Sequence, residues 1–190
     1  MATGLNTGRL AARVIMLTAV AYVALMSGCK SAPKMGSYTI VVTLDEGLRE
    51  RSGIMPSIEV DLIGVNEDGF NRLQGKNVDD YFSPGDVVRQ DEIRSQTVHR
   101  MAFTNENPGA KRLAWGDPIW TRWRDQRNPS QLVIMSSMSL PPNAQTGAMD
   151  PRRLVIPLTT ERWNDRQEIN IVVRPSGLSL ESPMKPERQR

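Results

Sequence analysis

Two residue types that commonly build functional sites are almost missing from this chain. Its 190 residues include one cysteine, Cys29, and one histidine, His99. A lone cysteine has no partner for an intrachain disulfide, and one cysteine with one histidine cannot supply the ligands of a thiolate and imidazole zinc site. No serine or cysteine motif accompanies His99, so a structural role is favoured over a catalytic one. The sequence therefore predicts no metal and no cofactor.

Catalytic motifs are missing as well, including the phosphate-binding glycine loop, the dinucleotide fingerprint and the Gly-x-Ser-x-Gly elbow. The remaining candidates are three carboxylate pairs: Asp45 with Glu46, Asp79 with Asp80, and Asp91 with Glu92. Neighbouring residues of a strand or coil point apart, and charged doublets are usually solvated, so the chain is not predicted to be an enzyme. A hydrolase built on Asp79 and Asp80 is the weakest of three functional hypotheses.

The charge of the chain is nearly balanced, with 24 basic and 21 acidic residues. Arg9 and Arg13 belong to the first 28 residues, which contain no acidic residue. Without that segment 22 basic residues face 21 acidic ones, a net charge of +1. A nucleic-acid-binding domain carries a clustered basic excess, so nucleic acid is not a predicted partner.

The longest apolar run, residues 14–26, follows Arg9 and Arg13 and ends shortly before Cys29. It is shorter than the roughly 20 apolar residues that a membrane-spanning helix needs. A positive flank, an apolar run and then small residues are typical of an export signal. The alternatives are an uncleaved signal anchor and an ordinary leader cleaved after the small pair Ala19 and Ala21.

The segment Leu25-Met26-Ser27-Gly28-Cys29 resembles a bacterial lipobox, with Met26 where leucine is usual. The resemblance implies acylation of the Cys29 thiol, cleavage before Cys29 and acylation of the new amino terminus. Two or more acyl chains give stable membrane attachment, because each buried methylene contributes about 0.8 kcal/mol. Lys30, where aspartate would resemble an inner-membrane retention signal, favours the outer membrane, with the protein facing the periplasm.

After this leader the pattern predicts one all-β domain. Alternating apolar residues and β-branched runs predict strands near residues 37–44, 58–65, 97–104, 131–138, 152–158, 169–174 and 176–180. Ile58, Val60 and Leu62 are expected to face the core, and Pro157 indicates an edge strand or a bulge. One or two short helical turns are expected between residues 66 and 86, strand or helix at 87–94, and irregular structure at 105–129. These elements predict an antiparallel β-sandwich.

The domain boundaries follow from the same pattern. We expect a signal peptide at residues 1–28, a tether at 29–36, the β-sandwich at 37–180 and a disordered tail at 181–190, which is charged and contains proline.

The region 115–124 concentrates aromatic and basic side chains: Trp115, Trp120, Arg122, Trp123 and Arg124. Such a cluster can stack on sugars, which makes binding of a glycan or of peptidoglycan the alternative function, or it can grip a protein partner. Tryptophans in irregular stretches also commonly plug one end of a sandwich, with arginines lying over them. The packing role is favoured, and exposure of the indoles distinguishes the two.

The order of features along the mature chain resembles the TssJ family, the outer-membrane lipoproteins of type VI secretion systems. The resemblance comprises the lipobox and tether, Pro56-Ser57 before the strand at 58–62, Phe70, Tyr81-Phe82, and the strands at 132–135, 152–158 and 171–174 followed by 177–180. It implies a transthyretin-like sandwich that docks the periplasmic domain of TssM, the large inner-membrane partner. The stretches 105–129 and 140–151 are longer than the family pattern.

The resemblance also implies a docking loop, residues 45–56, between the first two strands. Carried onto this chain, its apolar contacts are Leu48, Ile54 and Met55, and its charge complementarity comes from Arg49, Glu50 and Arg51. The leading hypothesis is thus a non-enzymatic, lipid-anchored scaffold or docking lipoprotein of the bacterial envelope, as a component of a type VI secretion membrane complex.

Overall fold

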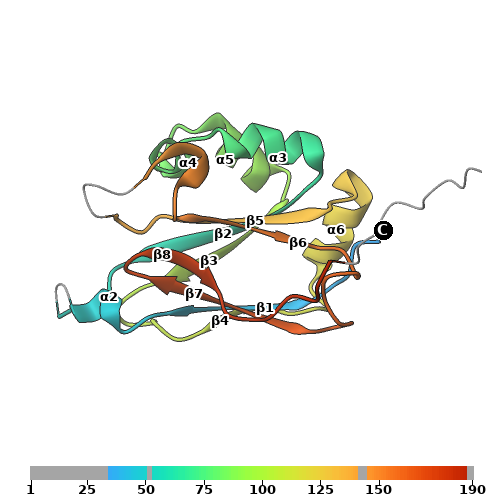
Figure 1. The fold of residues 1–190 in the computed structure, drawn as a ribbon. Coiled ribbons are helices and arrows are strands. Elements are labelled where there is room, and N and C mark those ends of the chain that lie inside the picture. The colour runs from blue at the N-terminus through green and yellow to red at the C-terminus, as the bar shows by residue number, and fades with distance from the viewer. Residues whose placement is uncertain (1–33, 51–52, 141–144, 188–190) are drawn as a thin grey trace, which may run out of the picture. The chain divides into compact units, whose positions relative to one another are not determined.

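The computed structural model describes residues 34–50, 53–140 and 145–187, which fold as two four-stranded sheets packed face to face (Figure 1). The strands are β1 (Thr39–Leu44), β2 (Ile58–Val65), β3 (Val98–Phe103), β4 (Lys111–Leu113), β5 (Gln131–Ser136), β6 (Arg153–Pro157), β7 (Glu168–Arg174) and β8 (Gly177–Leu180). The helices are α2 (Gly47–Glu50), α3 (Glu67–Gln74), α4 (Val78–Phe82), α5 (Val87–Arg94), α6 (Pro118–Arg127) and a 3₁₀ turn at Gly147–Met149. The predicted β-sandwich is confirmed.

One sheet has the order β4-β1-β7-β8 and the other the order β3-β2-β5-β6. Every pairing is antiparallel except that of β1 with β7, which is parallel in the register Thr39↔Glu168 to Leu44↔Val173. Pro157 ends β6, an edge strand, as its missing N–H predicts. The last two predicted strands, at 169–174 and 176–180, correspond to β7 and β8 and pair as a hairpin.

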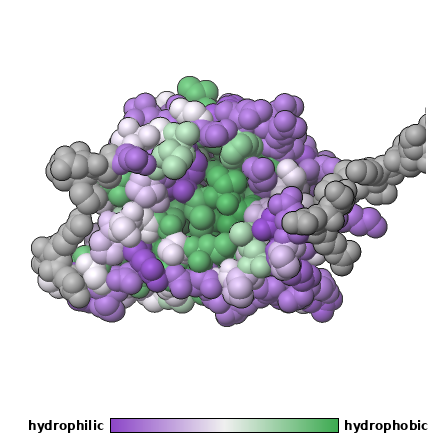
Figure 2. All heavy atoms as spheres, viewed as in Figure 1, coloured by the Kyte–Doolittle hydropathy of each residue, from purple (hydrophilic) through white to green (hydrophobic). Residues whose placement is uncertain are grey.

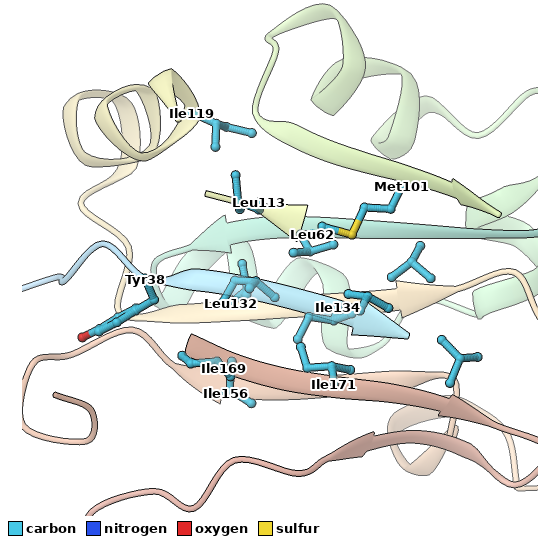
Figure 3. Close-up of a cluster of buried hydrophobic side chains, with 14 of the residues drawn as sticks. Tyr38, Leu62, Met101, Leu113, Ile119, Leu132, Ile134, Ile156, Ile169 and Ile171 are labelled. Atoms are coloured by element: carbon cyan, nitrogen blue, oxygen red, sulfur yellow. The ribbon is translucent and has the colours of Figure 1, made fainter. Parts of the chain in front are cut away.

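The main core lies between the two sheets (Figure 3). Ile58, Val60 and Leu62 of β2 point into it, as predicted, and each is at most 2% exposed. At the edge where β6 and β8 lie, leucines of both strands are only partly covered, and Figure 2 shows apolar side chains gathered in the middle of this face, with polar residues around them. The sandwich is therefore less completely closed at this edge.

A layer of three helices covers the outer face of the β3-β2-β5-β6 sheet (Figure 1). Its side-chain contacts bury Ile63 and Val65, so β2 is buried on both faces. The helices begin at the capping residues Asn66, Asn77 and Asp86, whose side chains accept hydrogen bonds from backbone N–H groups. The sequence predicted one or two helical turns before residue 86 and left 87–94 undecided, and the structure has two helices followed by α5.

The helical layer also buries a charge. Asp61 is fully buried on the outer face of β2, where Tyr81 donates a hydrogen bond of 3.0 Å and Arg89 one of 2.8 Å to its Oδ2. Burial raises the pKa of Tyr81, and Asp61 raises it further, so the phenol stays a donor. A buried carboxylate that lost these partners would be strongly destabilising, so Tyr81 and Arg89 fix the helices on the sheet.

Two short elements lie in the stretch 105–129 that was expected to be irregular. They are β4, an edge strand paired with β1, and the ten-residue helix α6, which packs against β2. Gly64 allows this packing, because a Cβ atom at Gly64 would lie 2.7 Å from Cδ2 of Trp123. The indole thus packs directly on the β2 backbone.

The ends of the domain also extend further than predicted. Residues 34–36, expected to be tether, contact the body through a bridge between Met35 and Thr159. Residues 181–187, expected to be disordered, are joined to it by backbone hydrogen bonds from Glu181 to Asn170 and from Lys185 to Arg162. These backbone hydrogen bonds order the segment, and its charged composition does not reveal them.

Replacing Gly64 by alanine should lower the free energy of unfolding by about 1–3 kcal/mol, because the added methyl group forces Trp123 away from β2. Urea unfolding of the purified chain measures this. Gly75→Ala is the control, since nothing lies within 4 Å of the Cβ it adds, and it should change stability by less than about 0.5 kcal/mol. Equal effects of the two substitutions would contradict the packing described here.

Candidate partner-binding surfaces

The predicted docking loop begins where β1 ends, and the short helix α2 forms its first half. Asp45 starts this helix by accepting a hydrogen bond of 2.8 Å from the Gly47 N–H at Oδ1. The backbone N–H of Asp45 donates to the Val173 carbonyl at 2.9 Å, which ties the loop to β7. Neighbouring strands therefore hold the base of the loop in place.

The three apolar residues predicted as partner contacts lie in two different environments. Leu48 is 8% exposed and Met55 2% exposed, and both belong to the main core, so these two side chains face inward. Ile54 is 59% exposed. The backbone N–H of Met55 also donates to Asn105 Oδ1 at 3.3 Å. Leu48 and Met55 anchor the two ends of the loop, and Ile54 is displayed between them.

The charged residues of the loop are only partly described. Arg49 forms an exposed ion pair with Glu46 at 3.1 Å, which contributes little to stability because water screens it. Glu50 lies in α2, but its side chain falls outside the described part, as do Arg51 and the predicted lipidation site Cys29. Of the three charged residues predicted to contact a partner, only Arg49 therefore has described side-chain contacts.

The loop lies far from the point where the described chain begins. Lys34 accepts a hydrogen bond from the Thr160 N–H at 3.1 Å, and Gly36 donates to Leu158 at 2.9 Å, near the start of β1. β1 then runs to α2 at the opposite end of the sheet (Figure 1). Its length is roughly 20 Å at about 3.3 Å per residue. The entry of the chain and the loop therefore occupy opposite ends of the sandwich.

The tryptophan and arginine region folds as a loop followed by α6. Asp117 caps this helix through the Ile119 N–H, Pro118 occupies its first turn, and Asn128 ends it in the left-handed conformation, with φ 43°. Trp120 and Trp123 are buried, and their indole N–H groups donate to the carbonyls of Ala114 at 2.9 Å and Thr97 at 2.7 Å. These two indoles pack in the core and present no face to a ligand.

The other members of the region are exposed. Trp115 is 47% exposed, and the guanidinium carbon of Arg166 lies 4.2 Å from the centroid of its ring, so one face is already occupied by a cation. Arg124 donates to the Ser37 hydroxyl at 3.2 Å, and Arg122 is exposed at the start of α6. The five predicted residues do not form one sugar-binding platform.

In each carboxylate pair of the sequence, at least one member forms an ion pair with an arginine. Hydrogen bonds from Arg152 lower the pKa of Asp79, so Asp79 is held ionised and does not share a proton with Asp80. Glu92 is buried and bound by Arg127 at 2.9 Å. Within the described residues no three His, Cys, Asp or Glu side chains gather in a way that could hold a metal ion.

The single histidine, His99, lies on β3 and lines a groove between this strand and α6. Burial lowers the pKa of its imidazole, and the nearby Asp117 carboxylate partly opposes that shift. The side chain is therefore held neutral at ordinary pH, as a packing residue would be.

Comparison with known proteins places the fold. No family model and no curated protein matches the chain. Among solved structures, the C-terminal domain of the type VI secretion protein TssM from EAEC has a TM-score of 0.51 at 11% identity, with 75% of this chain and 98% of that chain covered. A chain of a type VI membrane complex gives 0.50 at 12% identity, with 78% and 100% covered. The lipoprotein TssJ1 from Pseudomonas aeruginosa gives 0.45 at 11% identity, with 83% and 100% covered.

At these identities the first two matches show a shared fold. The predicted β-sandwich fold is thus shared with the C-terminal domain of TssM and with a chain of a type VI membrane complex. In the described part of the chain no helix has the length and apolar character to cross a bilayer.

The lowered pKa of His99 predicts a pH dependence of stability. The unfolded chain, with a histidine pKa of about 6.5, binds this proton more readily than the folded one, so stability is lost as the pH falls below about 6.5. Urea unfolding between about pH 8 and pH 5.5 should show the loss, and His99→Gln should remove it. A variant with an unchanged pH profile would refute this assignment, since the chain has no other histidine.

Proposed function

We propose that the chain is a non-enzymatic, lipid-anchored docking lipoprotein of the bacterial envelope, a component of a type VI secretion membrane complex. The lipobox-like sequence at Cys29 supports the anchor, and the shared fold supports the type of complex. The observation that carries the proposal concerns the loop at α2. Its residues Leu48 and Met55 are buried in the main core, and Ile54 is exposed.

The position of this loop fits the task. The described chain begins at Lys34, at the end of the sandwich where β1 begins, and an acyl anchor on Cys29 would precede Lys34 by five residues of sequence. The loop at α2, at the other end of β1, would then point away from the outer membrane and into the periplasm. A partner that rises from the inner membrane, as TssM does in the family that this chain resembles, would meet this end first.

The two ends of the loop are also suited to presenting a partner surface, because Leu48 and Met55 hold them to the core. Anchoring at both ends reduces the conformational entropy that a partner would have to remove on binding. An exposed isoleucine in a loop that also carries charged residues fits an apolar contact with a polar rim. The partner surface that we propose consists of Ile54 and Arg49, with Glu50 and Arg51 as further members. The buried side chains of Leu48 and Met55 hold this surface in place.

Ile54→Asp should weaken capture of the partner at least about tenfold, because it places a charge where an apolar contact is buried. The measurement is co-purification of the periplasmic domain of the TssM-like protein with the tagged full chain from membranes. Val87→Asp is the control, since Val87 is a 70% exposed apolar residue on α5 and lies outside the loop. Capture that is undiminished by Ile54→Asp would refute the proposed surface.

Cys29→Ser should abolish acylation, leaving a precursor that keeps residues 1–28 and runs more slowly on a gel. Metabolic labelling with a fatty-acid analogue, together with membrane fractionation, tests this, and Lys30→Ala serves as a control that retains the thiol. Label that persists in the Cys29→Ser chain would rule out the lipid anchor on this residue.

A further inference from the structure

The strand β3 is an edge of its sheet. Among the residues that the structure describes, β3 pairs with β2 alone, from Ile58↔Phe103 to Ile63↔Val98, and no strand lies on its other side. Edge strands present unpaired backbone groups, to which a further strand can add.

The hydrogen bonds of β2 show which backbone groups of β3 are unpaired. Glu59 donates its N–H to Ser137 Oγ at 2.8 Å and accepts from the Ser137 N–H at 2.9 Å, so its backbone faces β5. Val65 likewise accepts from Ser130 at 3.0 Å. Odd-numbered residues of β2 therefore face β5 and not β3.

In an antiparallel pair, two residues that lie opposite each other direct their backbone N–H and C=O groups either toward each other or both away from the shared ladder. Ala102 lies opposite Glu59, Arg100 opposite Asp61 and Val98 opposite Ile63. These three residues of β3 therefore direct their N–H and C=O groups to the free edge. They form three donor and acceptor pairs, spaced two residues apart, which is the spacing of a strand ladder.

A groove of about 550 Å³ runs along this edge. Residues from both faces of β3 line it, together with Ile93 and Gln96 near the end of α5 and Ile119 and Arg122 in the first half of α6. Figure 3 shows Met101 pointing from β3 toward Leu62, with Ile119 on the neighbouring helix. The two helices flank the edge and leave it open.

Apart from its ion-paired Glu59, the groove carries a net positive charge. Glu59 is paired with Arg89. Asp117, which caps α6 and keeps its charge, is outweighed by the two arginines of the groove, Arg100 and Arg122. Arg100 and Arg122 are exposed, and neither forms an ion pair or a side-chain hydrogen bond with any residue that the structure describes. Arg100 lies on the outer face of the sheet, and Arg122 comes from α6 on the side of the inner face.

We propose that the free edge of β3 docks an extended acidic segment of a partner protein, which joins the sheet as a fifth strand. Its carboxylates are an odd number of residues apart, because alternate side chains of a strand point to opposite faces and the two arginines lie on opposite faces. This site is separate from the loop at α2 and does not depend on its role.

A second copy of the chain is a poorer occupant. Antiparallel pairing of two β3 edges about Arg100 would set two guanidinium groups side by side, and like charges opposite each other destabilise a strand pair.

The probe is a fluorescein-labelled peptide, acetyl-Gly-Thr-Val-Glu-Glu-Val-Thr-Gly-amide, titrated with the full chain and followed by fluorescence anisotropy. Its adjacent glutamates point to opposite faces when the peptide is extended. We expect binding that weakens as salt is added, and at least tenfold weaker binding of the peptide with glutamine in place of both glutamates.

Variants of the chain separate the backbone and charge contributions. Ala102→Pro removes an N–H at the free edge without removing a bond to β2 and should weaken binding at least tenfold, whereas Ala102→Thr keeps the N–H and should leave binding within twofold. Arg100→Glu and Arg122→Glu should each weaken it similarly. Arg94→Glu, a change at an exposed arginine on α5 outside the groove, should not.

A peptide that is N-methylated at alternate residues loses the N–H groups that would pair with β3, while the protein itself is unchanged. The test of strand addition therefore does not depend on whether the Ala102→Pro variant folds. Loss of binding on N-methylation supports the added strand. Binding that survives N-methylation, that is equal for the glutamine peptide, or that is unaffected by both arginine changes would overturn the proposal. So would a dimer in sedimentation experiments that Ala102→Pro disrupts.

Discussion

The burial of β2 on both faces is the constraint on which the other features depend. One face meets the opposite sheet and the other is covered by α3, α4 and α5. Apart from Glu59 near its start, β2 has no exposed position for a charge, yet Asp61 lies at its centre with zero exposure. A buried carboxylate is tolerated only with hydrogen-bonded partners, so Tyr81 and Arg89 have to come from the helical layer. The helices therefore stabilise the sheet and neutralise its buried charge together.

The strands could be predicted because one face of each is apolar, and alternation reports that directly. Asp61 shows the limit of this signal. Its place between Val60 and Leu62 indicates a solvated outer face, and only the helical layer, which is distant in sequence, buries it. The helix α6 was missed although Asp117-Pro118 is a start signal for a helix, because most of its residues are polar or charged and its apolar residues are confined to its first half and Trp123.

The loop between β1 and β2 could be predicted from the sequence, but the orientation of its side chains could not. The length and composition of residues 45–56 indicated a loop, but apolar residues in a loop can serve a partner or the core, and composition does not distinguish the two. Leu48 and Met55 serve the core and Ile54 is exposed. The composition of β3 does not indicate that it is an edge strand, because that position depends on the order of the strands in the sheet. Which of its backbone groups are unpaired depends on its register with β2. Two surfaces result, one apolar and one basic, on different elements of the domain.

The route of β1 has a mechanical consequence. The polypeptide passes from Lys34 straight along β1 into α2, with no other element between them. A pull applied between the chain entry and the loop at α2 is thus transmitted by the covalent backbone of a single strand. The other seven strands and the helices lie outside this line of force, so tension of this kind would not shear the two sheets apart.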